Sequence, residues 1–262
     1  MLELYHNINS VCAQKVRIAL YEKNEDVKEH LLTLQGDQND PAYMKHNPNG
    51  VVPTLVHDDK AITESSLILY YLDDAFPDPP LMPKTPYARL RVRLYNKLID
   101  EYVHNACTIM TFATAFRPRF LKMSREQWLA EINKAPLKRR AEYKRSVIEH
   151  GLDSEFVADA LHQHKKLISW MADDLKRGPY LAGESFTNAD CAVVPYILRL
   201  ELLKLGAMWE VEPAVADWWA RVRNRPSVKA TIFERMKESD WAPFKNLSPD
   251  PWPKVQTLLK AA

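Results

Sequence analysis

The chain has 262 residues, of which 46% are apolar, and its 36 Lys and Arg nearly balance its 34 Asp and Glu. This is enough apolar material for one large or two modest domains, and the net charge of +2 gives no electrostatic argument for binding nucleic acid or an anionic membrane. No run approaches the roughly 18–20 apolar residues of a membrane helix, and the first residues lack the features of a secretory signal, so we expect a cytoplasmic protein.

The first element is a strand over residues 2–6, followed by a loop and then a helix that Ser10 caps. This places Cys12 in the first turn of the helix. Free backbone N–H groups, the helix dipole and Lys15 would stabilise a thiolate there. The alternative is that Cys12 is a small core residue beside a capping serine.

The next elements alternate between strands and short helices. Residues 27–34 read as a strand, residues 40–45 as a short helix with Pro at its first turn, and Asn47–Gly50 as a turn. Two β-prone runs, 54–57 and 60–63, predict a hairpin, although Asp58-Asp59 is only a fair two-residue turn. Apolar residues then recur with helical spacing from Glu64 to just before Pro77.

The start of that last helix, Thr63-Glu64-Ser65-Ser66, is a candidate anion site. Its free N–H groups favour a carboxylate, a serine hydroxyl can add a donor, and Glu64 can accept an ammonium, so an α-amino acid head group would fit. The alternative is that Thr63 only caps the helix and Glu64 is a first-turn acid. Pro53 is equally ambiguous by itself, because about one X-Pro bond in twenty is cis in folded proteins.

A family resemblance bears on these alternatives. The pattern Asn-Pro-x-Gly-x-Val-Pro-x-Leu at 47–55, followed by Glu64-Ser65 and an apolar helix ending in Tyr-Leu, resembles the glutathione-binding half of the glutathione transferases. The resemblance implies a cis Pro53, a Val52 backbone that pairs with the cysteinyl part of glutathione, and a Glu64-Ser65 pair that holds the γ-glutamyl head.

The turn Ser10-Val11-Cys12 is similar to the Ser-x-Cys turn of zeta-class transferases and bacterial glutathione-dependent reductive dehalogenases. The resemblance makes Ser10 and Cys12 the catalytic candidates. A hydroxyl can stabilise the glutathione thiolate, whereas a cysteine can attack a mixed glutathionyl adduct. Lys15 stands where a Cys-x-x-Cys pair would have its second cysteine, so no internal dithiol is expected.

Beyond a segment with five prolines in eleven residues, 76–86, the chain reads as helical. One long helix from about residue 90 should border the substrate cleft, although a Met, Thr and Phe stripe is more often core. The candidate substrate-pocket residues are His6, His104, Thr108, Phe112, Phe116 and Trp241.

Three later segments complete the reading. The charged stretch 122–159 resembles an insert of tetrachlorohydroquinone dehalogenase-like transferases. Thr187 and Asp190 form a capping box in the second strong family segment, so we expect Asp190 to hold the fold. The tail 241–253 has four prolines, which predict an extended segment lying on the protein, either as an aromatic wall of the cleft with Trp241 or Phe244 nearest the substrate, or as a strap over the core.

The expected architecture is a thioredoxin-like α/β domain of order βαβαββα (1–76), a Pro-rich linker (77–86), an all-α helical domain (87–240) and a tail (241–262). The implied activity is attack of the glutathione thiolate on a hydrophobic, aromatic or arylalkyl electrophile, with cleavage of an aryl ether or carbon–halogen bond. Two alternatives stay open: a glutathione-dependent thiol-disulfide reductase using Cys12, and a noncatalytic subunit of the same fold. A homodimer, or a heterodimer with a related transferase, is expected. The three cysteines lack metal-ligand spacing, so no metal is expected.

Overall fold

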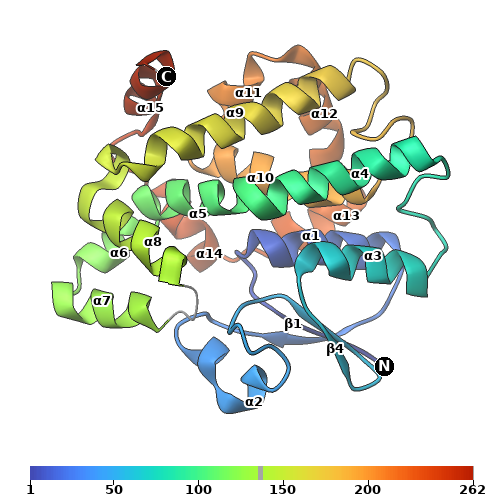
Figure 1. The fold of residues 1–262 in the computed structure, drawn as a ribbon, viewed down its shortest axis with the longest axis horizontal. Coiled ribbons are helices and arrows are strands. Elements are labelled where there is room, and N and C mark those ends of the chain that lie inside the picture. The colour runs from blue at the N-terminus through green and yellow to red at the C-terminus, as the bar shows by residue number, and fades with distance from the viewer. Residues whose placement is uncertain (135–137, 262) are drawn as a thin grey trace.

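A four-stranded sheet with helices beside it forms the N-terminal part of the chain, and helices joined by loops form the rest (Figure 1). The computed structural model describes residues 1–134 and 138–261. The N-terminal elements are β1 (Leu2–His6), α1 (Val11–Glu22), β2 (Lys28–Leu31), η1 (Asp37–Asn39), α2 (Pro41–Met44), β3 (Thr54–His57), β4 (Lys60–Ile62) and α3 (Ser65–Ala75). Apart from the short turn η1, this is the expected order βαβαββα, and the predicted fold class is confirmed.

The sheet has the strand order β2-β1-β3-β4, in which β1 runs parallel to β2 and antiparallel to β3. Tyr5, near the end of β1, lies opposite Thr54, the first residue of β3. The loop after β1 and the loop before β3 are therefore neighbours. The hairpin turn between β3 and β4 works because Asp58 and Asp59 both take positive φ, 47° and 63°, which matches the twist of the two strands.

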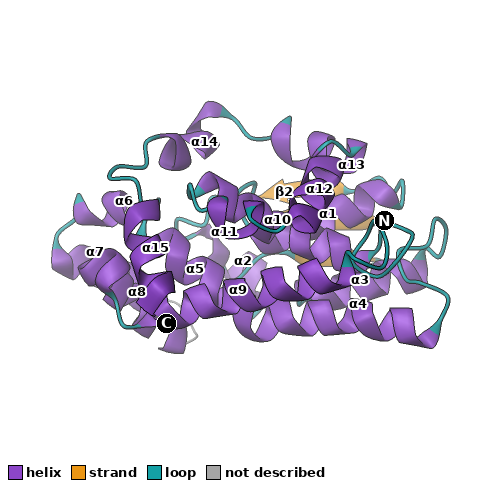
Figure 2. Ribbon diagram, turned by 90° about the horizontal axis from the view of Figure 1, so that it is seen from above, coloured by secondary structure: helices purple, strands orange, loops and turns teal. Residues whose placement is uncertain are grey.

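Helix α1 is buried from two sides, because it lies between the sheet and the C-terminal helices (Figure 1). It packs against α3 and, on its other side, against α10 (Asn188–Leu202). Val16, Ile18 and Ala19 are fully buried as a result. Seen from above in Figure 2, helices hide most of the sheet. The first turn of α1 therefore lies where the two parts of the molecule meet.

The remaining helices form the C-terminal part. They are α4 (Pro86–Leu98), η2 (Ile99–Val103), α5 (His104–Ala113), α6 (Arg117–Leu121), α7 (Arg125–Asn133), α8 (Lys138–His150), η3 (Gly151–Asp153), α9 (Phe156–Asp174), α11 (Ala207–Glu210), α12 (Pro213–Arg223), α13 (Pro226–Val228), η4 (Lys229–Phe233), α14 (Glu238–Lys245) and α15 (Trp252–Ala261). The main buried cluster is continuous from the sheet through these helices. No described helix is long and apolar enough to cross a bilayer.

The helix expected from residue 90 onward contains one irregular turn. The run α4-η2-α5 is continuous, but η2 is a π-helical turn. A π turn holds an extra residue, so it rotates the side chains that follow by about 100° relative to an uninterrupted α-helix. His104 is the first residue after this turn.

The prediction of an extended tail is wrong, because the tail contains α14 and α15, and α14 begins before residue 241. Pro253 stands in the first turn of α15, where a missing N–H costs nothing. Asp250 supports this helix start by accepting a 3.0 Å bond from the Trp252 amide. Pro243 lies inside α14 but removes only one hydrogen bond from a short helix. The number of prolines therefore gave a wrong prediction for the tail, because the effect of a proline on a helix depends on its position in that helix.

Candidate functional site

Ser10 sits at the start of α1 and its side chain has two uses. Its Oγ accepts a 3.3 Å bond from the Ala13 amide, which caps the helix. A hydroxyl that accepts through a lone pair keeps its O–H free to donate. Ser10 can therefore cap α1 and still donate a hydrogen bond to an anion placed above the helix start.

Two buried arginines hold the loop before Ser10 in place. Arg17 donates to the carbonyls of Asn7 and Ile8, each at 3.1 Å. Arg199, from α10, donates to the carbonyl of Asn9 at 2.6 Å. One arginine belongs to α1 itself and the other to α10, so the position of Ser10 depends in part on the docking of a C-terminal helix.

Cys12 is partly buried and meets two side chains from the C-terminal part. Its Sγ lies 3.4 Å from Nδ1 of His104 on α5 and 3.9 Å from the hydroxyl of Tyr196 on α10. The Tyr196 hydroxyl is also 3.2 Å from the same His104 nitrogen. Along the chain, His104 is 92 residues from Cys12 and Tyr196 is 184 residues from it, so only the fold brings the three side chains together.

This environment favours the thiolate of Cys12. Burial by itself raises the pKa of Cys12. His104, Lys15 and the Ser65 hydroxyl together outweigh burial and lower this pKa to about 6. The other two cysteines differ, because burial raises the pKa of Cys107 to about 11 and raises that of Cys191 well above its usual range. Of the three thiols, Cys12 alone has the character of a reactive cysteine.

The Glu64-Ser65 segment lies beside Cys12 at the start of α3. Glu64 has a left-handed φ of 63°, which turns the chain from β4 into the helix. No side chain caps α3, so the N–H groups of its first turn stay available for an anion. Ser65 is buried, whereas Glu64 is exposed at the rim.

Val52 and Pro53 border the same region from the sheet. The Val52–Pro53 peptide bond is cis, as the resemblance implies. Among the hydrogen bonds between described residues, none uses the backbone of Val52. Because β3 pairs with β1, this segment lies beside the loop that carries Ser10. An extended peptide could therefore pair with Val52 while its side chain reaches Ser10.

A buried cation lies one turn beyond Cys12. Lys15 donates to Ser66 at 2.8 Å and faces Asp100 at 3.4 Å, so it links α1, α3 and η2. The sequence predicts a positive charge near Cys12, but not that Asp100 partly neutralises it.

The predicted substrate-pocket residues do not all lie together in the structure. Thr108 is buried and donates its hydroxyl back to the His104 carbonyl at 3.0 Å. Phe112 and Phe116 belong to an aromatic group with ring centroids 5.5 Å apart, and Phe244 of the tail lies 5.9 Å from Phe116. Trp241 instead stacks on Phe233, at 6.3 Å. Of the two tail aromatics, it is Phe244 that reaches the α5 side.

His6 does not line a pocket, and that prediction is wrong. Its side chain is completely buried, with Nδ1 3.1 Å from Arg17 and Nε2 3.5 Å from Glu29. Burial and the charge of Arg17 lower the pKa of His6 to about 4. The alternation of β1 explains the error, because His6 shares the inward face with Leu2 and Leu4.

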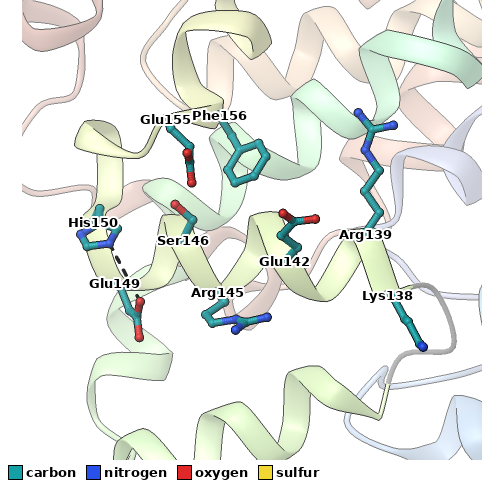
Figure 3. A pocket seen from close by; sticks show the side chains of 9 residues that line it. All are labelled: Lys138, Arg139, Glu142, Arg145, Ser146, Glu149, His150, Glu155 and Phe156. Carbon is teal, nitrogen blue, oxygen red and sulfur yellow. Dashed lines mark ion pairs between the residues drawn. The ribbon is translucent and has the colours of Figure 1, made fainter.

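Two surface hollows lie away from Ser10 and Cys12. One, of about 630 Å³, lies between α8 and the start of α9, where Glu155 and Phe156 face Ser146 (Figure 3). The other, of about 340 Å³, lies between α3 and the α4-η2 run and includes Ser66 and Asp100. Among the described residues, no cluster of His, Cys, Asp or Glu is arranged to hold a metal ion.

The sequence did not identify Tyr196 or Arg199 as site residues. Both belong to α10, a helix that reads as core throughout. Arg199 is a charged residue in an otherwise apolar stretch, but its type does not say what it contacts. The role of both residues arises only from contacts with the loop and first turn of α1.

Family models match both parts of the chain. The model of the glutathione S-transferase N-terminal domain matches residues 4–80, and that of the C-terminal domain matches residues 112–226. Protein LigF of Sphingobium sp. strain SYK-6 is 27% identical over 250 residues, which cover 91% of this chain and 95% of LigF. The crystal structure of the β-etherase LigF superposes with a TM-score of 0.78 and 26% identity, covering 90% of this chain and 99% of LigF.

Two other relatives have similar identity. Glutathione S-transferase TCHQD of Arabidopsis thaliana is 28% identical over 239 residues, covering 88% of this chain and 89% of its own. A stringent starvation protein A homologue of Pasteurella multocida is 28% identical over 232 residues, which cover 88% of this chain and 90% of the homologue.

Proposed function

We propose that this chain, which belongs to the glutathione S-transferase family, uses the glutathione thiolate to attack a hydrophobic aromatic or arylalkyl electrophile. In the step we propose, a carbon–sulfur bond forms at the electrophilic carbon while its bond to an aryloxide or halide breaks. The leaving group departs with the bonding electrons: an aryloxide then takes a proton from water, whereas a halide stays as the free anion. The chain needs to supply only position and charge stabilisation for this reaction.

One observation carries the proposal: the start of α1, with Ser10 and Cys12, lies beside the start of α3 at Ser65. The Ser65 hydroxyl is close enough to lower the pKa of Cys12, and Lys15 on α1 donates to Ser66 on α3. A γ-glutamyl head at Ser65 would thus place a thiol near Ser10. Family membership supports glutathione as the co-substrate.

Similarity to the β-etherase LigF along nearly the whole chain supports ether cleavage as the first choice among leaving groups. The aromatic group of Phe112, Phe116 and Phe244 supports an apolar, aromatic substrate. We therefore place an aryl ether first and an aryl halide second.

A second activity is favoured by the contact between Cys12 and His104. A Cys12 thiolate could attack the glutathione sulfur of a mixed disulfide, so that a Cys12–glutathione disulfide forms and the substrate leaves as a thiolate. A second glutathione thiolate would then release Cys12 and form glutathione disulfide. The noncatalytic alternative stays a prediction. The dimer and the cytoplasmic location stay predictions.

A glutathione-dependent turnover screen tests these activities. The purified protein and its Cys12→Ser variant are assayed on β-aryl ethers, aryl halides and mixed disulfides. We expect both proteins to cleave an aryl ether, and only the wild type to reduce mixed disulfides. Absence of turnover on all three classes, with glutathione still bound in calorimetry, would favour the noncatalytic alternative.

The head-group site has its own test. We expect Glu64→Ala and Ser65→Ala each to raise the KM for glutathione roughly tenfold or more, because hydrogen bonds to charged groups are worth about 1.5–3 kcal/mol. Glutathione affinity is measured by calorimetry, with Glu184→Ala, a change outside the site, as the control. Unchanged affinity in both site variants would remove this head-group site.

A further inference from the structure

The contact between Cys12 and His104 is not needed for attack by the glutathione sulfur, which suggests that it has a separate role. The two side chains meet across the boundary between the N-terminal and C-terminal parts, with 3.4 Å between Sγ and Nδ1. The π turn η2 ends at the residue before His104 and sets the direction in which α5 presents it.

We propose that His104 is a positioning residue that takes the proton of Cys12, so that the protein holds a thiolate–imidazolium pair before any glutathione binds. The Cys12 S–H bond breaks and an N–H bond forms at Nδ1 of His104. No electrons leave the pair, and no co-reactant is consumed. The new N–H then donates to the thiolate that it created.

Tyr196 can stabilise the thiolate state of the pair. Its hydroxyl is 3.2 Å from His104 Nδ1 and 3.9 Å from Cys12 Sγ. Burial raises the pKa of Tyr196 well above its usual range, so the hydroxyl keeps its proton and can donate a hydrogen bond. Nδ1 has a single lone pair, which the Cys12 S–H needs before transfer, so Tyr196 acts after transfer, when its hydroxyl can donate to the sulfur beside the new N–H.

Other charged and titratable groups around Cys12 are less direct. Lys15 faces Asp100 at 3.4 Å and bonds to Ser66, so part of its charge is already balanced. Cys107 on α5 is buried, and its raised pKa keeps it neutral. Among the described residues, the His104 ring is the one nitrogen base within hydrogen-bond distance of Sγ.

The pair makes Cys12 a nucleophile near neutral pH. This deepens the second activity proposed above, reduction of mixed disulfides, because that activity needs a thiolate at Cys12. The test uses the protein without glutathione, so its outcome is separate from the outcome of the turnover screen.

The experiment measures alkylation of Cys12 by iodoacetamide as a function of pH, with the modified peptide quantified by mass spectrometry. We expect a wild-type midpoint near pH 6. In His104→Asn the midpoint should rise by about two pH units, toward the value of about 8.5 for an ordinary thiol. The midpoint is the readout, because a more basic thiolate is also a better nucleophile and partly hides the change in rate at one pH.

The controls separate this role from a structural one. His162→Asn makes the same change on an exposed position of α9 and should leave the midpoint in place. Tyr196→Phe should raise the midpoint by less than His104→Asn. If His104→Asn does not fold, His104→Gln, which fills more of the site, takes its place. A wild-type midpoint near 8.5, or an unmoved midpoint in a folded His104 variant, would overturn the proposal.

Discussion

Replacing Ser10 with alanine should lower the kcat of glutathione transfer on the order of 100-fold. The Ser10 O–H is free to donate because its oxygen caps α1 through a lone pair. Loss of one preorganised donor to a reacting anion typically costs about 10²–10³ in kcat. The same change should raise the pKa of bound glutathione, followed by the ultraviolet absorbance of the thiolate, whereas Cys12→Ser should leave that pKa nearly unchanged.

The control must match the loss of a helix cap, which by itself costs about 0.5–2 kcal/mol of stability. Ser124→Ala provides it, because Ser124 caps α7 through a 3.2 Å bond to Gln127 and lies far from Ser10 in the chain. Its thermal shift should resemble that of Ser10→Ala, with kcat preserved. If Ser10→Ala keeps full turnover while Cys12→Ser loses it, Cys12 is the primary catalytic group.

Asp190→Ala should destabilise the protein by at least about 3 kcal/mol. Asp190 is completely buried, and burial raises its pKa, while four donors act in the opposite direction. One carboxylate oxygen accepts from Trp218 at 2.9 Å and from the Leu181 amide at 3.1 Å, and the other accepts from the amide and hydroxyl of Thr187. Alanine would leave all four donors buried and unpaired.

For a chain of this length, a loss of that size corresponds to a fall in Tm of about 10 °C, measurable by calorimetry. Asp173→Ala removes an exposed carboxylate whose partner is Lys176, and should change stability by less than about 0.5 kcal/mol. The Tm of Asp190→Asn should lie between the Tm values of Asp190→Ala and Asp173→Ala, because the asparagine amide keeps one acceptor oxygen. Equal Tm values for Asp190→Ala and Asp173→Ala would contradict a structural role for Asp190.

The sequence by itself determined the fold class and the local features that build the site. The strand and helix periods set the order βαβαββα, and the capping box at Thr187 and Asp190 is present as predicted. These features depend on residues within a few positions of one another, so their physics can be read from a short window. The tail was misread because proline either ends or begins a helix, and only the position of the helix start decides which.

Only the tertiary structure decided what surrounds Cys12. His104 and Tyr196 reach it from 92 and 184 residues away, through the packing of α1 against α10 and through the rotation that the π turn introduces. His6, which the sequence placed in the substrate pocket, is buried on the inward face of β1 against Arg17 and Glu29. Local periodicity says which face of a helix is apolar, but not which residues of another helix will meet it. The protonation state of Cys12 depends on those neighbours, because burial and nearby charges set the pKa of a thiol.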